Sequence, residues 1–242
     1  MPVKFVDHTK NIVEVKNVSY SYFPGNPVLK NISLNIHKGD YLGVVGPNGG
    51  GKSTLIKLIL GLIKPPTGEI NMFCKNIAYV GQKATDFDQK FPATVNDVVS
   101  MGRYSAKGLF KGLGSGDKKI VAEAIEQVGM SDYKDRLIGD LSGGQQQKTF
   151  IARALAQHPE IIFLDEPTSG VDQASQEQFY KILKQLNLDL GITLVLISHD
   201  VDVITQEVTE IAAVNQTLVF YGPSKEFIKE EHGIKFIHHT HD

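Results

Sequence analysis

Two glycine-containing stretches in this chain can each bind an anion. The first is GPNGGGKST, residues 46–54, and the second is LSGGQ, residues 141–145, which leads directly into the helical pattern QQKTFIARAL. Glycine lets backbone N–H groups point at a bound anion, and a helix N-terminus adds unpaired N–H groups and partial positive charge. One nucleotide has one triphosphate, so the second stretch needs its own explanation.

Residues 46–53 fit the phosphate-loop pattern G-x-x-x-x-G-K-S, between the expected strand YLGVVG and the expected helix KSTLIKLILGLI. This context favours a phosphate loop over a glycine-rich turn that happens to precede a lysine. We expect Lys52 to bind the β- and γ-phosphates, Ser53 to bind Mg²⁺ and Thr54 to reach the α-phosphate. The predicted ATP-binding residues of the loop are Gly46, Pro47, Asn48, Gly49, Gly50, Gly51, Lys52, Ser53 and Thr54.

A second chemical signal is the segment IIFLDEPTSG, in which an apolar strand ends in two carboxylates, Asp165 and Glu166. Ligands of doubly wound folds bind at the carboxyl ends of the strands. We expect Asp165 to hold Mg²⁺ and Glu166 to orient and deprotonate the water that attacks the γ-phosphate. The alternative is a solvated acidic turn, which the preceding hydrophobic strand disfavours.

Composition sets the class of protein. The chain has 242 residues, a formal net charge of −2 and 41% hydrophobic residues, as in an ordinary soluble globular protein, and the charge gives no sign of nucleic-acid binding. Its single cysteine, Cys74, excludes an internal disulfide, and we expect a small buried side chain there. No run approaches the roughly 20 apolar residues of a membrane span, and the first residues lack the apolar core of a signal peptide. We therefore expect a cytoplasmic protein that acts at a membrane only by docking onto another protein.

The hydrophobic patterns predict the elements that carry these residues. Alternation in IVEVKNVSYSY and VLKNISLNI predicts two strands joined at PGNP, and GEINMF and NIAYVGQ predict two more. Helical patterns follow in FPATVNDVVSMG, DKKIVAEAIEQVGM and QASQEQFYKILKQLNLD, and the apolar runs EIIFLD and ITLVLIS predict buried strands. TEIAAVN and TLVFYG predict a closing pair of strands. Alternating buried strands and helices indicate an α/β fold with a mostly parallel sheet.

The ordered set GPNGGGKST, YVGQ, LSGGQ, IIFLDEPTSGVD and LISHD resembles the ATP-binding subunits of ABC transporters, from about residue 12 to residue 221. The resemblance implies a P-loop NTPase core of the RecA type at about 1–83 and 158–222, with an N-terminal antiparallel β subdomain. It further implies an inserted α-helical subdomain at about 84–157 and a C-terminal histidine-containing tail at 223–242.

Further roles come from the resemblance alone. Tyr22 matches the aromatic residue that stacks on adenine, and Gln82 the glutamine that reaches the metal and the attacking water. His199 matches the histidine that contacts the γ-phosphate, and Asp172 lies in the loop that communicates between subunits. Glu166, His199 and Gln82 would be catalytic, and Ser53, Gln82 and Asp165 would hold Mg²⁺. The implied signature loop is Ser142, Gly143, Gly144 and Gln145.

The resemblance also answers the question of the second glycine stretch. In this family two ATPase domains pack head to tail, and each signature loop covers the ATP held by the other domain's phosphate loop. The expected partners are a second copy of this chain, integral-membrane permease subunits at the cytoplasmic face and, indirectly, an extracytoplasmic metal-binding protein, but no nucleic acid. Expected ligands are ATP and Mg²⁺.

The segment FPATVNDVVSMGRYSAKGLF is similar to the helical insert of importers for divalent metals such as zinc and manganese, with iron-chelate and B12 importers as the alternative. A soluble ABC ATPase without a transport role is disfavoured, because such proteins usually carry two fused units or long inserts. Phe87, Phe91, Val98 and Tyr104 are candidates for docking the permease, or else core residues. The histidines of the tail, His232, His238, His239 and His241, are a candidate zinc site or a polar end. Lys107, Lys111, Lys118 and Lys119 form a loose basic cluster.

Overall fold

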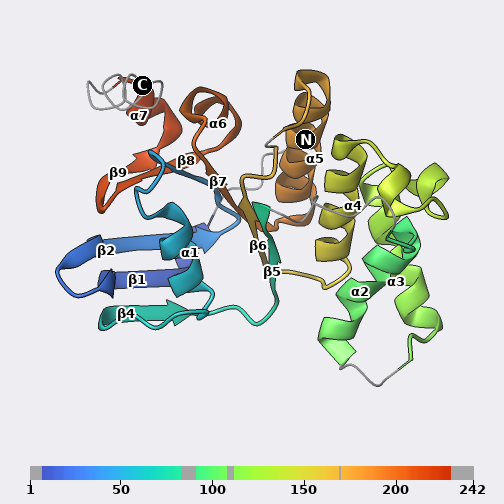
Figure 1. The fold of residues 1–242 in the computed structure, drawn as a ribbon, viewed down its shortest axis with the longest axis horizontal. Coiled ribbons are helices and arrows are strands. Elements are labelled where there is room, and N and C mark those ends of the chain that lie inside the picture. The colour runs from blue at the N-terminus through green and yellow to red at the C-terminus, as the bar shows by residue number, and fades with distance from the viewer. Residues whose placement is uncertain (1–6, 83–90, 108–111, 169, 230–242) are drawn as a thin grey trace. The chain divides into compact units, whose positions relative to one another are not determined.

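The structure is a computed structural model that describes residues 7–82, 91–107, 112–168 and 170–229 (Figure 1). The chain forms two compact units, one from Met1–Lys75 and Leu186–Asp242 and the other from Asn76–Gln185. The division falls inside helix α5 (Gln173–Leu190). The limits expected from the resemblance, such as 84–157 for the helical subdomain, follow the parts of the family's domain and not the tertiary contacts. They stay a prediction.

An antiparallel sheet begins the first unit. Strand β1 (Asp7–Phe23) lies between β2 (Asn26–Lys38) and β4 (Thr67–Met72), as Figure 1 shows. The turn from β1 to β2 passes through Gly25 at φ +82, a conformation that favours glycine. Alternate apolar side chains of β1 and β2 are buried, which the alternating sequence predicts.

A parallel sheet carries the chemistry of the first unit. Strand β3 (Tyr41–Val45) pairs in parallel with β7 (Thr193–Ser198) on one side and with β8 (Glu210–Asn215) on the other. Strand β9 (Thr217–Pro223) closes this side in antiparallel pairing with β8. Every residue of β3 and β7 is buried, as expected for parallel strands that are covered on both faces. Among the described residues, the helices that lie wholly within this unit are α1 (Lys52–Ile59), α6 (Val201–Glu207) and α7 (Ser224–Lys229).

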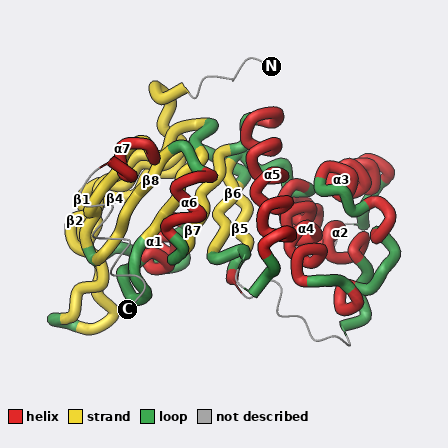
Figure 2. Tube along the Cα trace, turned by 90° about the horizontal axis from the view of Figure 1, so that it is seen from above, coloured by secondary structure: helices red, strands yellow, loops and turns green. Residues whose placement is uncertain are grey.

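The second unit combines parallel strands with several helices, as Figure 2 shows. Strand β5 (Ile77–Val80) pairs with β6 (Ile161–Asp165), which is wholly buried. Between them come α2 (Val95–Lys107), α3 (Ser115–Gln127) and α4 (Gly143–Leu155), with short 3₁₀ turns at Ser131–Tyr133 and Ile138–Asp140.

A buried ion pair joins the three helices α2, α3 and α4. The Arg103 side chain donates from Nε to Asp117 Oδ1 over 3.1 Å and from a terminal nitrogen to the Ala156 carbonyl over 2.7 Å. Close to it, a Cβ added at Gly102 would stand 2.2 Å from the Arg153 carbonyl oxygen, so only glycine lets α2 and α4 approach this closely. The carboxyl end of α4 is therefore fixed in place.

The predicted strands and the long helices are confirmed, and so is the α/β fold with a mostly parallel sheet and an antiparallel N-terminal sheet. The short helices α6 and α7 were not predicted. Cys74 is half-buried rather than buried, so that expectation is wrong. Among the described residues, no helix combines the length and the apolar character needed to cross a membrane.

Candidate functional site

The phosphate loop of the first unit is a tight turn between β3 and α1. Gly46 has φ +155, and a Cβ there would lie 2.1 Å from the Val214 carbonyl oxygen. Gly51, at φ +99, leaves no room either, because a Cβ would lie 2.5 Å from Leu29 Cδ2. Backbone bonds brace the loop: Gly50 N–H donates to the Pro47 carbonyl over 3.0 Å, and Gln216 N–H donates to the Gly50 carbonyl over 2.8 Å. The glycines are thus required by close packing as well as by backbone conformation.

Lys52 lies inside this loop. Its Nζ donates to the Gly46 carbonyl over 2.7 Å and to the Pro47 carbonyl over 3.0 Å, and the residue is 6% exposed. The loop therefore fixes an ammonium group at its centre, held by neutral acceptors that a phosphate oxygen can replace with a stronger, charge-assisted bond.

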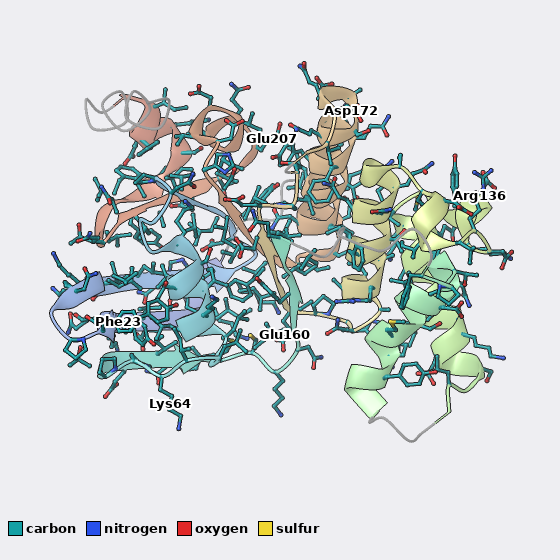
Figure 3. All side chains as sticks on the ribbon, in the orientation of Figure 1. Phe23, Lys64, Arg136, Glu160, Asp172 and Glu207 are labelled. Carbon is teal, nitrogen blue, oxygen red and sulfur yellow. The ribbon has the colours of Figure 1, made fainter. Side chains whose placement is uncertain are left out.

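The predicted adenine-stacking residue also contacts the phosphate loop. The hydroxyl of Tyr22 lies 3.3 Å from the Thr54 hydroxyl, and Tyr22, near the end of β1, is 48% exposed. Its neighbour Phe23 is more exposed and lies at the tip of the antiparallel sheet (Figure 3). Tyr22, rather than Phe23, is thus tied to the phosphate loop.

His199 lies at the edge of the sheet from which the phosphate loop also begins. Val45 and Ser198 are paired in the register of β3 and β7, so Gly46 and His199 both leave the sheet at the next position. Asp200 follows as the N-cap of α6, accepting the Val203 N–H over 3.2 Å. The end of a strand and a helix cap thus hold the exposed His199 at the carboxyl edge, where ligands of α/β proteins bind.

The second unit assembles the acidic part of the site. Val80 and Leu164 are register partners in β5 and β6, so Gln82 and Glu166 leave adjacent strands together. Gln82 Nε2 donates to Glu166 Oε2 over 2.8 Å. Glu166 has φ +47, a left-handed conformation that is uncommon for residues other than glycine and often found at functional sites. Sequence reasoning assigned both residues to catalysis, and the structure joins them directly.

Tyr79 is a neighbour of this pair that the sequence did not reveal. Its hydroxyl donates to Asp165 Oδ2 over 3.2 Å. Burial, and then the charge of Asp165, raise the pKa of Tyr79 to about 12, so the phenol stays protonated and keeps donating. The tyrosine is visible in IAYVGQ, but its role depends on the pairing of β5 with β6, which the local pattern does not specify.

The signature loop, residues 142–145, is the N-terminus of α4. Ser142 is the N-cap: its Oγ accepts the Gln145 N–H over 3.4 Å, and its own N–H donates to Gln145 Oε1 over 3.0 Å. Ser142 and Gly143 are exposed, and the first turn contains no acidic residue, so the partial positive charge of the helix faces solvent uncompensated. A Cβ on the buried Gly144 would stand 2.9 Å from Ser175 Cβ, so this glycine serves packing against α5.

Asp172 lies where α5 begins, as Figure 3 shows. Its Oδ1 accepts the Ser175 N–H over 3.0 Å, which makes it a helix cap in this chain. Hydrogen bonds from Ser175, the side chain first and the backbone second, hold the pKa of Asp172 below its ordinary value. The hydrogen bonds of Asp172 within its own helix do not test its predicted role in communication between subunits, which stays a prediction.

The candidate docking residues have different outcomes. Phe91 and Tyr104 are 38% and 39% exposed, whereas Val98 is wholly buried, so of the two readings offered for Val98 the core residue is confirmed and docking is excluded. Phe87, Lys111 and the four tail histidines lie outside the described residues, and of Lys107 only the backbone is described. Within the described ranges, no group of three or more histidine, cysteine, aspartate or glutamate side chains could hold a metal ion.

Both the sequence and the fold of this chain are similar to those of known proteins. The family described as "ABC transporter" matches residues 29–169. The zinc uptake system ATP-binding protein ZurA of Listeria monocytogenes is 44% identical over 227 residues, covering 90% of this chain and 88% of that protein. The manganese transport system ATP-binding protein MntB of the same organism is 41% identical over 226 residues, covering 90% and 93%. A solved dimeric structure of the ATP-binding cassette MJ0796, bound to ADP and Pi, matches with a TM-score of 0.72 and 28% identity, covering 88% of this chain and 98% of that one.

Proposed function

The chain belongs to the ABC transporter family, and from that premise we propose that it is the energy-coupling ATPase of an importer for divalent metal ions, with zinc or manganese as cargo. Relatives named for zinc uptake and for manganese transport align over nine-tenths of the chain, which supports this cargo class. Hydrolysis of ATP is the activity of the family. The observation that carries it in this chain is the hydrogen bond from Gln82 to Glu166 at the end of β6.

The described contacts support a role for each residue. Lys52 and the glycines of the phosphate loop bind the β- and γ-phosphates, and Tyr22 stacks on adenine beside the loop. Glu166, oriented by Gln82, accepts a proton from the attacking water. His199, at the edge where the phosphate loop begins, donates a hydrogen bond to the γ-phosphate.

Mg²⁺ fits the donors that the chain offers. Asp165 supplies a carboxylate, Gln82 an amide oxygen and Ser53 a hydroxyl, and these hard oxygen donors suit magnesium. A magnesium ion held by these donors would neutralise charge that develops on the phosphate oxygens. Tyr79 orients Asp165 through its hydrogen bond, so the carboxylate is already held before the ion arrives.

The exposed signature loop supports a head-to-tail homodimer. It is an anion site without an acidic residue in its first turn, and its occupant in this proposal is the ATP held by a second copy of the chain. The related cassette MJ0796 is dimeric in its ADP-bound and Pi-bound structure, which agrees with this arrangement. The dimer binds an integral-membrane permease at the cytoplasmic face of the membrane, and an extracytoplasmic metal-binding protein delivers the cargo.

The test of the activity is Glu166→Gln in the full-length chain. We expect ATP to bind while hydrolysis falls by about 10²- to 10⁴-fold, the usual contribution of a general base. Steady-state phosphate release and equilibrium binding of ATP measure the two effects. Hydrolysis at the parental rate would exclude Glu166 as the base.

The cargo is tested by uptake in cells that lack this chain. We expect uptake of zinc or manganese to fall and to return with the parental gene, but not with Glu166→Gln. A defect confined to iron chelates or to B12 would replace the metal-ion proposal by the related alternative. Recovery of ribosomes or DNA with the purified chain, without a permease, would place it among soluble ABC ATPases.

A further inference from the structure

Three consecutive residues at the end of β6 are each held by one side chain. Tyr79 donates to Asp165, and Gln82 donates to Glu166. The third contact is different, because Gln147 Nε2 donates to the carbonyl oxygen of Pro167 and comes from α4, the helix that begins with the signature loop. All of these residues belong to the unit Asn76–Gln185.

The Gln147 side chain is buried in the second unit. The residue is 3% exposed, and it lines a small cavity with a volume of about 10 Å³ accessible to water. The other residues lining the cavity are Val80, Gly81, Gln82, Phe150, Pro167 and Phe179. This volume is at the lower limit for a single water, so nothing larger binds here.

The orientation of the Gln147 amide follows from its acceptor. A carbonyl oxygen can only accept, so the NH₂ group must face Pro167 and Oε1 must face away. Among the described residues, no group lies within hydrogen-bonding reach of the buried Oε1. Burying an acceptor without a partner costs free energy, whereas methionine would fill the same space without that cost. The bond to the Pro167 carbonyl and the unpaired Oε1 therefore act on stability in opposite directions, so the net stabilisation by an amide at this position is small.

At Pro167, only the carbonyl oxygen of the backbone can form a hydrogen bond. Proline has no N–H, so its carbonyl oxygen is its sole backbone hydrogen-bonding group. The preceding residue, Glu166, holds the left-handed backbone conformation at φ +47, which persists only where the surroundings enforce it. The Gln147 amide fixes the carbonyl of Pro167, and thus the peptide unit between Pro167 and Thr168, one residue beyond the catalytic carboxylate.

We propose that Gln147 is a positioning residue that ties α4 to the segment carrying Glu166. The role rests on the proposed function, because it acts on the carboxylate that activates water. The carboxyl end of α4 is anchored by the bond from Arg103 to the Ala156 carbonyl, and its amino end is the signature loop. A nucleotide that binds at the signature loop thereby biases the position of Glu166 in the same chain through Gln147.

The test compares Gln147→Met with Lys148→Met in the full-length chain. Methionine at position 147 keeps the volume and removes the amide, so we expect kcat to fall about tenfold while the affinity for ATP stays within about twofold. The unfolding temperature should change by no more than a few degrees. Lys148, the next residue of α4, is the matched control, because its Nζ donates over 3.0 Å to the side chain of Gln178 on α5 in a solvent-exposed contact. Its removal should leave kcat unchanged.

A double-mutant cycle separates positioning from general damage. If Gln147 acts through Glu166, then Gln147→Met should not lower the residual rate of Glu166→Gln any further. An additional tenfold loss in that background would overturn the proposal. So would a kcat of Gln147→Met within twofold of the parental value. The parental rate, measured in parallel, reports separately on the proposed ATPase function.

A second variant decides the matter even if methionine at 147 weakens the fold. In Gln147→Glu the ionised carboxylate repels the Pro167 carbonyl, but the protonated acid can donate to it, and burial raises the pKa of such an acid. We expect the activity of this variant, relative to the parental chain, to rise as the pH is lowered from about 8 to about 6. A ratio that does not change with pH would contradict a donor role for residue 147.

Discussion

Lys52 is held by the carbonyl oxygens of its own loop. Two of its acceptors are the neutral carbonyl oxygens of Gly46 and Pro47, and an anionic phosphate oxygen would accept a stronger, charge-assisted bond. Lys52 is almost wholly buried, so its stem packs inside the protein while Nζ contacts the loop carbonyls. The side chain therefore contributes to the shape of the loop as well as to the binding of phosphate, and a test must separate the two.

Lys52→Met keeps most of the buried stem and removes the charge. Loss of a charge-assisted hydrogen bond of about 1.5–3 kcal/mol corresponds to a roughly 10- to 100-fold weaker affinity for ATP. Equilibrium titration with ATP measures this change, and the unfolding temperature checks the fold. Lys57→Met, on the exposed side of the same helix, is the control and should bind ATP as the parental chain does. Equal binding by Lys52→Met would remove Lys52 from the nucleotide site.

Residues of the site differ in how far sequence alone could predict them. Gly46 and Lys52 were predictable because a loop of fixed length between a strand and a helix determines the geometry locally. The contact between Gln82 and Glu166 agrees with their predicted catalytic roles, although its existence depends on two strands distant in sequence. Tyr79 and Gln147 could not be found, because a phenol in a strand and an amide in a helix have no local signature of their partners.

Elements were predicted where the pattern is long. Helix α5 has 18 residues of amphipathic sequence, whereas α6 has seven residues and is specified largely by the Asp200 cap. A short helix offers too few turns for periodicity to distinguish it from a loop. The same reasoning applies to α7, which has six residues. The division of the described chain at residues 75 and 185 is a property of tertiary contacts, which no composition shift marks.

Helix α2 provides an element-scale prediction that depends on pH. Its N-terminus is a reciprocal cap: Thr94 N–H and Oγ1 donate to Asp97 Oδ2 over 2.9 and 2.6 Å, and Asp97 N–H donates to Thr94 Oγ1 over 3.1 Å. The Thr94 side chain, and then its backbone, hold the pKa of Asp97 below its ordinary value. A lowered carboxyl pKa stabilises the fold above the unfolded-state pKa, and this contribution is lost as the pH falls through the folded-state pKa.

We therefore expect Thr94→Ala to cost about 1 kcal/mol at neutral pH. Asp97→Asn should also destabilise the fold at pH 7, and its difference from the parental chain should shrink as the pH falls below about 4. Denaturant unfolding at a series of pH values measures both. A difference between Asp97→Asn and the parental chain that stays constant down to pH 3 would show that the ionised carboxylate does not stabilise the cap.

At the scale of the whole molecule, the chain has one phosphate loop and one exposed signature loop, and the proposal requires two chains for each nucleotide. A cis arrangement and a head-to-tail dimer both predict that a variant lacking either loop is inactive. They differ when two inactive variants are mixed, because only a dimer can combine the intact phosphate loop of one chain with the intact signature loop of another.

The decisive mixture contains Lys52→Met and Ser142→Arg at equal concentration. Ser142→Arg places a bulky cation on the exposed cap of α4, so it should bind ATP normally as a monomer and yet fail to hydrolyse it. Random pairing makes about half of the dimers mixed, each with one intact site of two, so the mixture should recover about a quarter of the parental ATPase rate. The rate should rise with protein concentration, because the active species is a dimer. If no activity returns while mixed dimers form, the shared site is wrong, and the signature loop must be given a role within its own chain.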